Sequence, residues 1–316
     1  MYDSVRSEVE SILDLTYAAE RRGTDKKLTE LYELAKKQQW NAATAINWQE
    51  ENANPQQRIL EDERMAIYGT RYWDQLDEEG QIRLNRDWSA YTLSQILDAE
   101  QAALLICGQL VNVMPKLEQK LCAAVQLLDE ARHVEVFRRY LDKRLEGKKY
   151  PMNPSLLELI RLLRADKKWH HKLVGMQLII EGIAISSFRS MLASAHDPLI
   201  KKVVEYVLRD ESRHIAFGVI AIRETVSRLA NQDREDLARF AYETVIRASG
   251  RYFPREIYQE LGFGKEEIEE ISRLSQEGPY RKQFLQNLFS VVMVNIKQAE
   301  LITPMIRHRY QESGLL

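Results

Sequence analysis

Cysteine, glycine and proline are all scarce in this sequence of 316 residues. Only Cys107 and Cys122 are present, which excludes a disulfide framework and a cysteine-rich zinc or iron–sulfur site. The 13 glycines and 8 prolines fall below the usual shares of about 7% and about 5%. So few helix breakers in so long a chain predict long helices.

An excess of charge of one sign and long hydrophobic runs are also lacking. The formal net charge is −2 and the pI is near 6.4, so we expect no electrostatic attraction to nucleic acid or to an anionic membrane. The first residues, MYDSVRSEVES, lack the apolar core of a secretory signal, and the most apolar segments are short or carry Glu and Gln. The sequence therefore predicts a cytoplasmic protein with neither nucleic acid nor a membrane as partner.

Helical periodicity dominates the chain, and no alternating β pattern of useful length occurs. No linker-like composition divides it, so we expect one all-α domain over residues 1–316, with core helices at about 80–229 and helical extensions at 1–79 and 230–316. A polar loop is expected at 41–57. The expected helices are 5–38 with a break near 23–25, 58–76, 80–113, one ending near 146, one near 194, one near 229, and three or four over 233–309.

One five-residue pattern occurs twice. The stretches LLDEARHVEV (127–136) and LRDESRHIAF (208–217) both contain Asp-Glu-x-Arg-His, offset by 210 − 129 = 81 residues. A Glu and a His three residues apart project from the same face of a helix. A single Glu-x-x-His is expected by chance in a chain of this size, but two copies with matching Asp and Arg are hard to explain in that way.

Two further glutamates stand in strongly apolar helical surroundings: Glu100 in LDAEQAALLICG and Glu181 in LIIEGIAISSF. Each precedes the glutamate of a repeated motif by 30 residues, and 51 residues separate the two pairs. Pro115 marks the middle of the first interval, and Asp197-Pro198, a good cap and first-turn pair, marks the second. Each interval therefore predicts a helical hairpin with two arms of about 22 Å each. The second arm returns the second glutamate to the level of the first.

The 51-residue middle interval exceeds what a tight turn between helices requires. About 20 of its residues are left over, and a segment near 147–165 could run the length of the bundle. We therefore expect a crossover that joins the two hairpins and brings four carboxylates and two imidazoles into one layer.

The full set resembles the ligand pattern of the ferritin-like di-iron carboxylate proteins, in which two helices each supply one Glu and two others each supply Glu-x-x-His. The flanking Asp and Arg are most similar to those of bacterial multicomponent monooxygenase hydroxylase subunits and acyl-carrier-protein desaturases. The resemblance covers about residues 91–220 and implies a ferritin-like four-helix bundle with additional N- and C-terminal helices. The residues that carry it are Glu100, Glu130, His133, Glu181, Glu211 and His214.

The resemblance implies a cofactor of two iron ions, with Mn/Fe as the alternative. Four buried carboxylates without counter-charge would be very costly, and two divalent cations cancel that charge. Mixed imidazole and carboxylate ligation suits iron or manganese, whereas zinc more often recruits Cys. By resemblance, Glu100 and His133 would bind one ion, Glu181 and His214 the other, and Glu130 and Glu211 would bridge them.

Four residues of the repeated motif would support these ligands. Asp129 and Asp210 would accept the free imidazole N–H groups and so orient the rings, although the sequence does not say which Asp serves which His. Arg132 and Arg213, three residues later, could neutralise the two aspartates or could face solvent.

Residues one turn from the ligands should line the space beside the metals. Such a lining could form a small apolar pocket for O2 and an organic substrate, although ordinary bundle core is an equal alternative for each residue. Its expected members are Ala103, Cys107, Phe137, Ala184, Ile185, Phe188 and Val207, with Gln126 and Gln177 as the polar exceptions.

Three positions depart from named subfamilies. Phe137 stands where many ribonucleotide reductase small subunits carry a radical-forming Tyr, and Val207 where arylamine oxygenases carry an extra His. Ile185 stands where multicomponent monooxygenases place a Thr. No subfamily is matched in full.

The expected function is that of an O2-activating oxidase or monooxygenase acting on a small organic substrate by hydroxylation, desaturation or N-oxidation. No catalytic residue beyond the metal ligands is predicted. The chain lacks a flavin-type G-x-G-x-x-G and has too few cysteines for a cluster, so a ferredoxin or reductase should supply electrons. A homodimer is compatible with such folds. The alternative is a radical-generating subunit like that of ribonucleotide reductase, or a non-catalytic metal-binding subunit.

Overall fold

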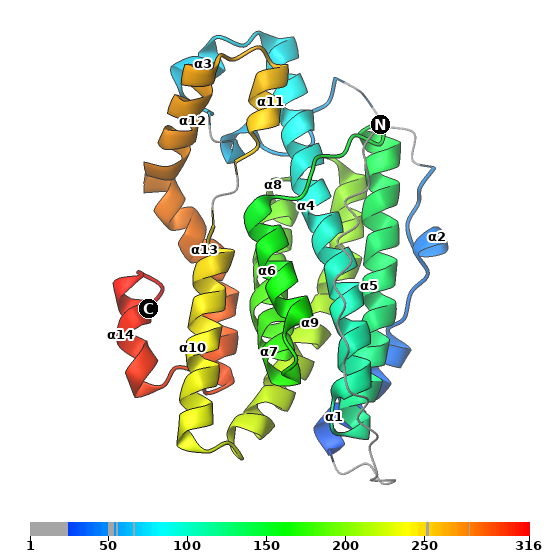
Figure 1. Cartoon of the computed structure of the whole chain (residues 1–316). Coiled ribbons are helices and arrows are strands. Elements are labelled where there is room, and N and C mark those ends of the chain that lie inside the picture. The colour runs from blue at the N-terminus through cyan, green and yellow to red at the C-terminus, as the bar shows by residue number, and fades with distance from the viewer. Residues whose placement is uncertain (1–24, 50–53, 55, 66, 251–252, 278) are drawn as a thin grey trace.

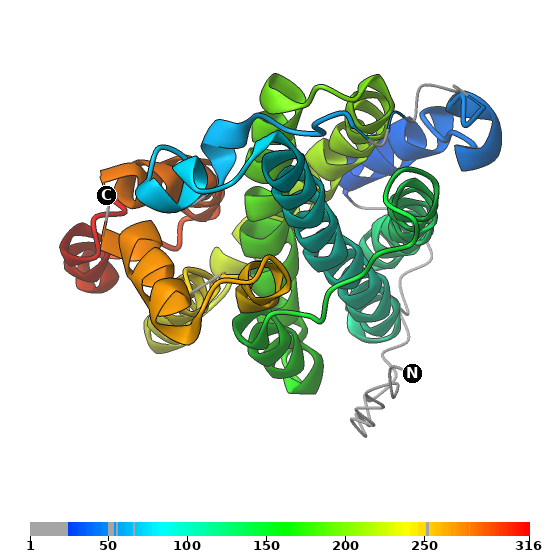
Figure 2. The same ribbon diagram turned by 90° about the horizontal axis from the view of Figure 1, so that it is seen from above.

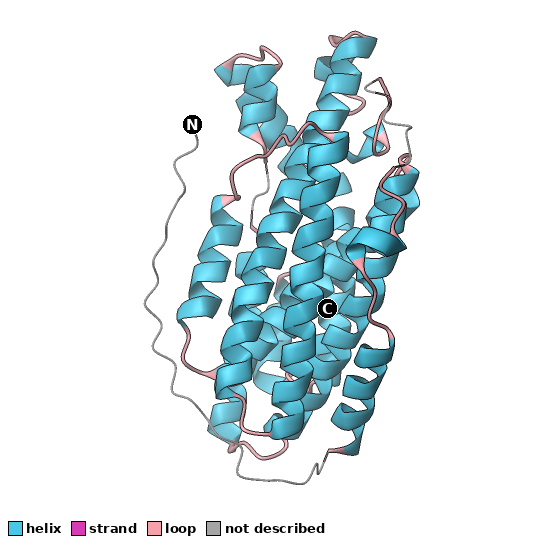
Figure 3. Cartoon of the chain, turned by 90° about the vertical axis from the view of Figure 1, so that its right-hand side faces the viewer, coloured by secondary structure: helices cyan, strands magenta, loops and turns pink. Residues whose placement is uncertain are grey.

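The structure is a computed structural model that describes residues 25–49, 54, 56–65, 67–250, 253–277 and 279–316. Within these ranges every regular element is a helix, and β pairing is limited to an isolated bridge between Leu60 and Ala195. Figure 3 shows the helices and the loops that join them. The all-α prediction is therefore confirmed.

Two helical hairpins form the centre of the molecule (Figures 1 and 2). The first is made of α4 (Glu78–Val113) and α5 (Leu117–Arg144), and the second of α8 (Glu181–Ser194) and α9 (Pro198–Val226). The hairpins meet where α5 packs against α9. The result is the expected four-helix bundle.

The hairpins turn where the sequence predicts. Helices α4 and α8 end at Val113 and Ser194, and α5 and α9 begin at Leu117 and Pro198, so both turns have the 81-residue offset of the motif. The Asp197 side chain caps α9 by accepting a backbone N–H at 2.8 Å, and Pro198 occupies the first turn. Equal arm lengths return the second ligand of each hairpin to the level of the first.

A π-helix, Val174–Ile180, lies between α7 (Trp169–Leu173) and α8, where the sequence predicts only continuous helix. Its wider turn shifts the register of the side chains that precede Glu181. Gly175 permits a close approach at this point, because a Cβ there would lie 2.2 Å from Cδ2 of Leu163. The π-helix thus packs closely against Leu163 and leads directly into α8, which carries the predicted ligand Glu181.

The crossover between the hairpins contains a helix of its own, α6 (Pro154–Ala165). Two residues of α4 bind the preceding segment: the Ser94 hydroxyl accepts the Tyr150 N–H at 3.1 Å, and Gln95 Oε1 accepts the Asn153 N–H at 2.7 Å. The fully buried Lys172 donates to the carbonyls of the last turn of α6 at 2.7 and 2.8 Å. The expected crossover is confirmed, and these bonds attach it to α4 and α7.

The helix predicted at 58–76 is wrong. Among the described residues of this range, only a 3₁₀ turn, Asp62–Arg64, and the short α3 (Arg71–Asp74) are helical. The Asn85 side chain accepts the Ile59 N–H at 2.8 Å and donates to the Leu60 carbonyl at 2.7 Å. The Ile59 carbonyl also accepts a hydrogen bond at 2.8 Å from the backbone at residue 196, in the α8–α9 turn. These tertiary bonds take the backbone groups that a helix would have used.

The remaining N-terminal part is α1 (Lys26–Lys37), followed by a single turn, α2 (Ala42–Ala45), inside the expected loop at 41–57. Residues 5–24 of the predicted helix 5–38 lie outside the described residues. They include most of the break predicted near 23–25. In Figure 1, α1 lies beside the lower part of α5, at the end of the bundle where α4 turns into α5.

The described residues of the C-terminal part form more helices than the three or four predicted. They are α10 (Asn231–Ala248), α11 (Arg255–Glu260), α12 (Lys265–Glu277), α13 (Pro279–Gln298) and α14 (Pro304–Glu312). Helix α13 packs along α8, and its Asn295 side chain donates to the carbonyl of Leu178 in the π-helix at 3.1 Å. The C-terminal extension therefore supports the irregular stretch before Glu181.

The buried apolar side chains of the bundle fall mainly into two clusters, one containing Phe137, Phe188 and Val207 and the other Ala103 and Phe217. Two helical segments, Glu78–Val113 and Trp169–Ser194, are long and apolar enough to cross a membrane by length and composition alone. Both belong to the bundle, and core helices of soluble proteins pass the same test.

Candidate metal centre

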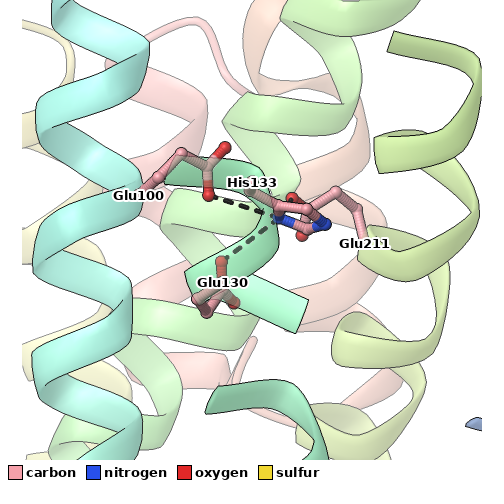
Figure 4. A group of neighbouring side chains, drawn as sticks. All are labelled: Glu100, Glu130, His133 and Glu211. Atoms are coloured by element: carbon pink, nitrogen blue, oxygen red, sulfur yellow. Dashed lines mark ion pairs between the residues drawn. The ribbon is translucent and has the colours of Figure 1, made fainter. Parts of the chain in front are cut away.

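The structure brings the six predicted ligands together in the middle of the bundle. Their ligand atoms form two groups, each within 4.8 Å: Glu100, Glu130, His133 and Glu211, and Glu130, Glu181, Glu211 and His214. Figure 4 shows the first group, with side chains from α4, α5 and α9 pointing toward one another. All six residues are buried, and the two groups share Glu130 and Glu211.

In the first group, carboxylate oxygens surround Nδ1 of His133. The distances are 3.4 Å to Glu100, 3.4 Å to Glu130 and 3.2 Å to Glu211. Glutamates from three helices therefore face one imidazole nitrogen.

The second group repeats this arrangement around Nδ1 of His214. The distances are 2.9 Å to Glu211, 3.3 Å to Glu130 and 3.5 Å to Glu181. Because the opposite oxygens of Glu130 and Glu211 face the two histidines, each of these carboxylates spans both groups.

Each imidazole is oriented by the aspartate of the other motif. Nε2 of His133 lies 3.1 Å from Asp210, and Nε2 of His214 lies 3.3 Å from Asp129. An ionised carboxylate only accepts hydrogen bonds, so Nε2 carries the proton and the lone pair of Nδ1 faces the carboxylates. The structure thus answers what the sequence left open: the pairing is crossed between the hairpins.

Arg132 and Arg213 are buried beside these aspartates rather than exposed on the surface. Arg132 forms ion pairs with Asp129 of its own helix and, at 3.0 Å, with Asp210. Arg213 forms the reciprocal pairs with Asp210 and, at 3.1 Å, with Asp129. Two cations thus balance two anions, and all four side chains join α5 to α9.

The donor set fits a pair of divalent cations. Burial raises the pKa of the Glu100 and Glu181 carboxyls well above their ordinary range. Burial opposes charge on His133 and His214 as well, but the surrounding carboxylates outweigh it and raise the pKa of both imidazoles. Without metal, protons must therefore offset the negative charge of the cluster.

Hydrogen bonding supports the same fit. Oε2 of Glu130, Nδ1 of His133 and Oε1 of Glu211 are buried atoms without a hydrogen-bond partner among the described residues. All three belong to the first ligand group and face its centre. A cation at the centre of the first group would give these atoms the partners that burial otherwise denies them.

Sequence reasoning missed the end of α1 and the residues just after it. Gln39 donates to Asp129 at 3.0 Å and accepts from Arg132 at 2.8 Å, while Gln38 accepts from Arg213 at 2.8 Å. The Trp40 indole donates to Asp210 at 2.8 Å. No spacing relates these residues to the motifs 90 or more residues later, so only the folded chain shows that they cover the aspartates.

The predicted pocket residues lie on both sides of the ligand layer. Phe137 and Phe188 stack at 5.7 Å on the side that holds Val207, and Ile185 is also buried. Ala184 packs against this cluster, whereas Ala103 belongs to the second cluster.

Polar groups occur on the other side. Gln126 and Gln177 are buried there beside Glu130 and Glu181. Burial raises the pKa of the fully buried Cys107 thiol well above its usual range, which keeps it protonated. A cavity of about 20 Å³ between α1, α5 and α9 reaches Gln126 and His214, and its size suits one water molecule.

The comparisons with known proteins agree with this geometry. The model of the family described as p-aminobenzoate N-oxygenase AurF matches residues 21–294. The chain belongs to the AurF family. No functionally curated protein matches the sequence.

Solved structures place this AurF-family chain in the ferritin-like fold. The R2-like ligand-binding oxidase from Sulfolobus acidocaldarius is 20% identical, with 87% of this chain and 92% of that chain covered and a TM-score of 0.52. A point mutant of an R2-like ligand-binding oxidase, with an anaerobically reconstituted Mn/Fe cofactor, is 18% identical, with 87% and 93% covered and a TM-score of 0.54. Another point mutant, with an aerobically reconstituted Mn/Fe cofactor, gives 20% identity, 87% and 94% coverage and a TM-score of 0.53.

This AurF-family protein is an O2-activating dinuclear-iron oxidase or oxygenase that acts on a small organic substrate. The departures found in the sequence persist in the structure. Val207 is fully buried among apolar side chains, and Phe137 is fully buried against Phe188. Neither position supplies a metal-binding group or a phenol.

Proposed function

We propose that this protein N-oxidises a small primary aromatic amine of the p-aminobenzoate type. One observation carries the proposal: six buried ligand side chains converge in two groups that share two carboxylates, in a chain that matches the p-aminobenzoate N-oxygenase model over residues 21–294. Two bound iron ions would supply the redox and Lewis-acid chemistry that activates O2.

The proposed ligands follow the two groups. Glu100 and His133 would hold one ion and Glu181 and His214 the other, and Glu130 and Glu211, which belong to both groups, would serve both ions. Mn/Fe occupancy is the alternative to Fe/Fe. Asp129 and Asp210 keep the Nε2 protons in place, so that both Nδ1 atoms stay available as ligands.

The surrounding residues exclude water and maintain charge balance. Phe137 and Phe188 close one side of the ligand layer, and the crossed Asp–Arg pairs lie on the α1 side, beside the cavity of about 20 Å³. A site closed in this way limits loss of the oxidant to solvent.

Insertion of one oxygen atom from O2 also requires two electrons. Both cysteines are buried as free thiols and the chain lacks a flavin motif, so we propose an external donor such as a ferredoxin or a reductase. A homodimer, a cytoplasmic location and a single domain over residues 1–316 belong to the same proposal.

The test is an ¹⁸O₂ experiment. Protein loaded anaerobically with Fe(II) is mixed with p-aminobenzoate and a chemical reductant, exposed to ¹⁸O₂, and its products are analysed by mass spectrometry. We expect ¹⁸O on nitrogen over repeated turnovers and about two irons per chain. Glu181→Ala should abolish the product, whereas the matched control Glu205→Ala, exposed on α9, should not. A single stoichiometric oxidation without labelled product would instead support the radical-generating or non-catalytic alternative.

A further inference from the structure

Two glutamines form a chain of amides that ends on the ligand carboxylates. Nε2 of Gln126 donates to Oε1 of Glu130 and to Oε1 of Glu181, both at 2.9 Å. Oε1 of Gln126 accepts from Nε2 of Gln177 at 3.0 Å. Both amides are buried, at 2% and 0% exposure, so these bonds are shielded from solvent.

The carboxylates determine the orientation of both amides. As metal ligands, Glu130 and Glu181 are ionised and can only accept, so Gln126 must point its NH₂ group toward them. Its carbonyl oxygen then faces Gln177 and requires a donor there. Gln177 must use its own NH₂ group for that bond, and its carbonyl oxygen is left at the free end of the chain.

That carbonyl oxygen has no partner within the part of the chain that the structure describes. Oε1 of Gln177 is buried and accepts no hydrogen bond from any of the described residues. Buried acceptors are nearly always satisfied, so an acceptor left open beside a reaction centre indicates that another molecule fills it. The molecule that fits must bring a donor, an N–H or an O–H.

The backbone is shaped to hold Gln177 in this position. The residue lies in the π-helix four residues before Glu181, and π-turns within helices are frequent at functional sites. On the facing helix α9, Gly218 leaves room for it, because a Cβ at position 218 would lie 2.4 Å from Cβ of Gln177. A wide helical turn and a glycine thus jointly place this one amide.

We propose that Oε1 of Gln177 accepts a hydrogen bond from the N–H of the amine substrate, with Gln126 orienting the amide. The inference rests on the proposed N-oxidation and adds the residue that recognises the reacting group. It gives the site a preference for amines over molecules of the same shape without an N–H. A product in which every N–H has been replaced by an N–O bond cannot make the contact.

The test compares two ligands of similar shape, p-aminobenzoate and 4-methylbenzoate, of which only the first carries N–H groups. Binding to the Fe(II)-loaded protein is measured without O2 by isothermal titration calorimetry. We expect the wild type to bind p-aminobenzoate about tenfold more tightly, because loss of a buried hydrogen bond commonly costs about that factor. Gln177→Met should reduce the ratio to below about twofold, with little change for 4-methylbenzoate.

Two further variants separate recognition from stability. Gly218→Ala displaces Gln177 without altering its chemistry and should also lower the ratio, and so should Gln177→Asn, which withdraws the oxygen by one methylene. Gln101→Met, at an exposed position of α4, is the control and should keep the wild-type ratio. Iron content and circular dichroism show that each variant retains the centre and the fold.

The outcomes distinguish the two proposals. An unchanged tenfold ratio in iron-loaded Gln177→Met or Gln177→Asn overturns the role of Gln177, as does a wild type without any preference. If either of these results is found and the product still carries ¹⁸O on nitrogen, the proposed N-oxidation is retained. Conversely, a wild-type preference that Gln177→Met removes, with no ¹⁸O on nitrogen, rejects the reaction and retains the amine contact.

Discussion

The two hairpins supply the same ligands, but different residues surround them. Glu100 stands in the uninterrupted helix α4, whereas Glu181 directly follows a π-helix. Gln126 contacts Glu181, and in the described residues no amide does the same for Glu100. The repeat therefore accounts for metal binding, and the departures from it gather on the Glu181 side, where a substrate contact is proposed.

The aspartates differ in a similar way. Asp129 is covered by the Gln39 amide, whereas Asp210 receives the Trp40 indole, whose ring also lies 4.7 Å from the guanidinium of Arg132. The duplicated part is therefore the ligand geometry, while α1 and the π-helix make the two halves unequal.

The largest predicted effect is the loss of bound metal when a ligand that belongs to both groups is removed. Glu211 belongs to both ligand groups and Glu100 to one, so Glu211→Ala should remove nearly all bound metal while Glu100→Ala keeps about one ion per chain. The expected loss of affinity in Glu211→Ala exceeds about a hundredfold, more than removal of a ligand's hydrogen-bond partner costs. Metal analysis after dialysis is the measurement. Two ions retained by Glu211→Ala would contradict the shared site.

The next comparison is between the two aspartates. Asp210→Asn and Asp129→Asn should each weaken metal binding by about 10- to 100-fold, because an amide can present its NH₂ group to the imidazole and favour the wrong tautomer. We expect the larger effect for Asp210, which also binds Trp40 at 2.8 Å. Competitive titration with a chelator measures both affinities. Equal losses would show that the indole adds nothing to this half.

The free energy of unfolding of the metal-free protein should depend on pH, because both halves bury titratable ligand side chains. The folded-state pKa values of Glu100, Glu181, His133 and His214 are raised, by burial for the carboxyls and by the neighbouring carboxylates for the imidazoles. Ordinary values are about 4.3 for Glu and about 6.5 for His, so above these the folded protein binds more protons than the unfolded chain. Its free energy of unfolding should therefore fall as the pH rises from about 5 to 8.

Metal binding should show the opposite trend, since the ions displace those protons. Affinity should rise by up to about tenfold per pH unit for each proton released. Urea denaturation with and without metal at several pH values tests both trends. A metal-free protein that gains stability between about pH 5 and 8 would refute this account, and Glu181→Ala should reduce its slope.

The smallest predicted effect concerns the helices that carry the first and third glutamates. Gly175 lies six residues before Glu181, and its counterpart in the first hairpin is Ser94, six before Glu100. Gly175→Ala would place a methyl group 2.2 Å from Leu163 and should cost about 1–3 kcal/mol by overpacking. Ser94→Ala creates no clash and should cost about 1 kcal/mol through the lost bond to the Tyr150 N–H. Urea denaturation measures the loss of stability in both variants. A larger loss in Gly175→Ala than in Ser94→Ala would show that the close contact is confined to the second half.

The ligand set could be predicted from the sequence because it depends on local regularities. Glu-x-x-His lies on one helical face at any place in a fold, and two 30-residue intervals with a turn signal at each centre predict two hairpins of equal length. The structure has these hairpins, with turns after Val113 and Ser194.

What could not be predicted depends on contacts distant in sequence. Asn85 and the α8–α9 turn hold residues 59 and 60 out of the helix expected at 58–76. The π-helix depends on Leu163 and Asn295, which pack against it from other helices. The covering role of Trp40 requires α1 to lie across α5 and α9, which no periodicity near residue 40 indicates.

The crossed pairing of aspartates and histidines has a consequence for unfolding. Each hairpin orients the imidazole of the other, and both arginines span the same junction, so opening one hairpin leaves buried charges unpaired in its neighbour. Amide hydrogens of α5 and α9 should accordingly exchange with deuterium through one joint opening event, with equal protection for the two helices.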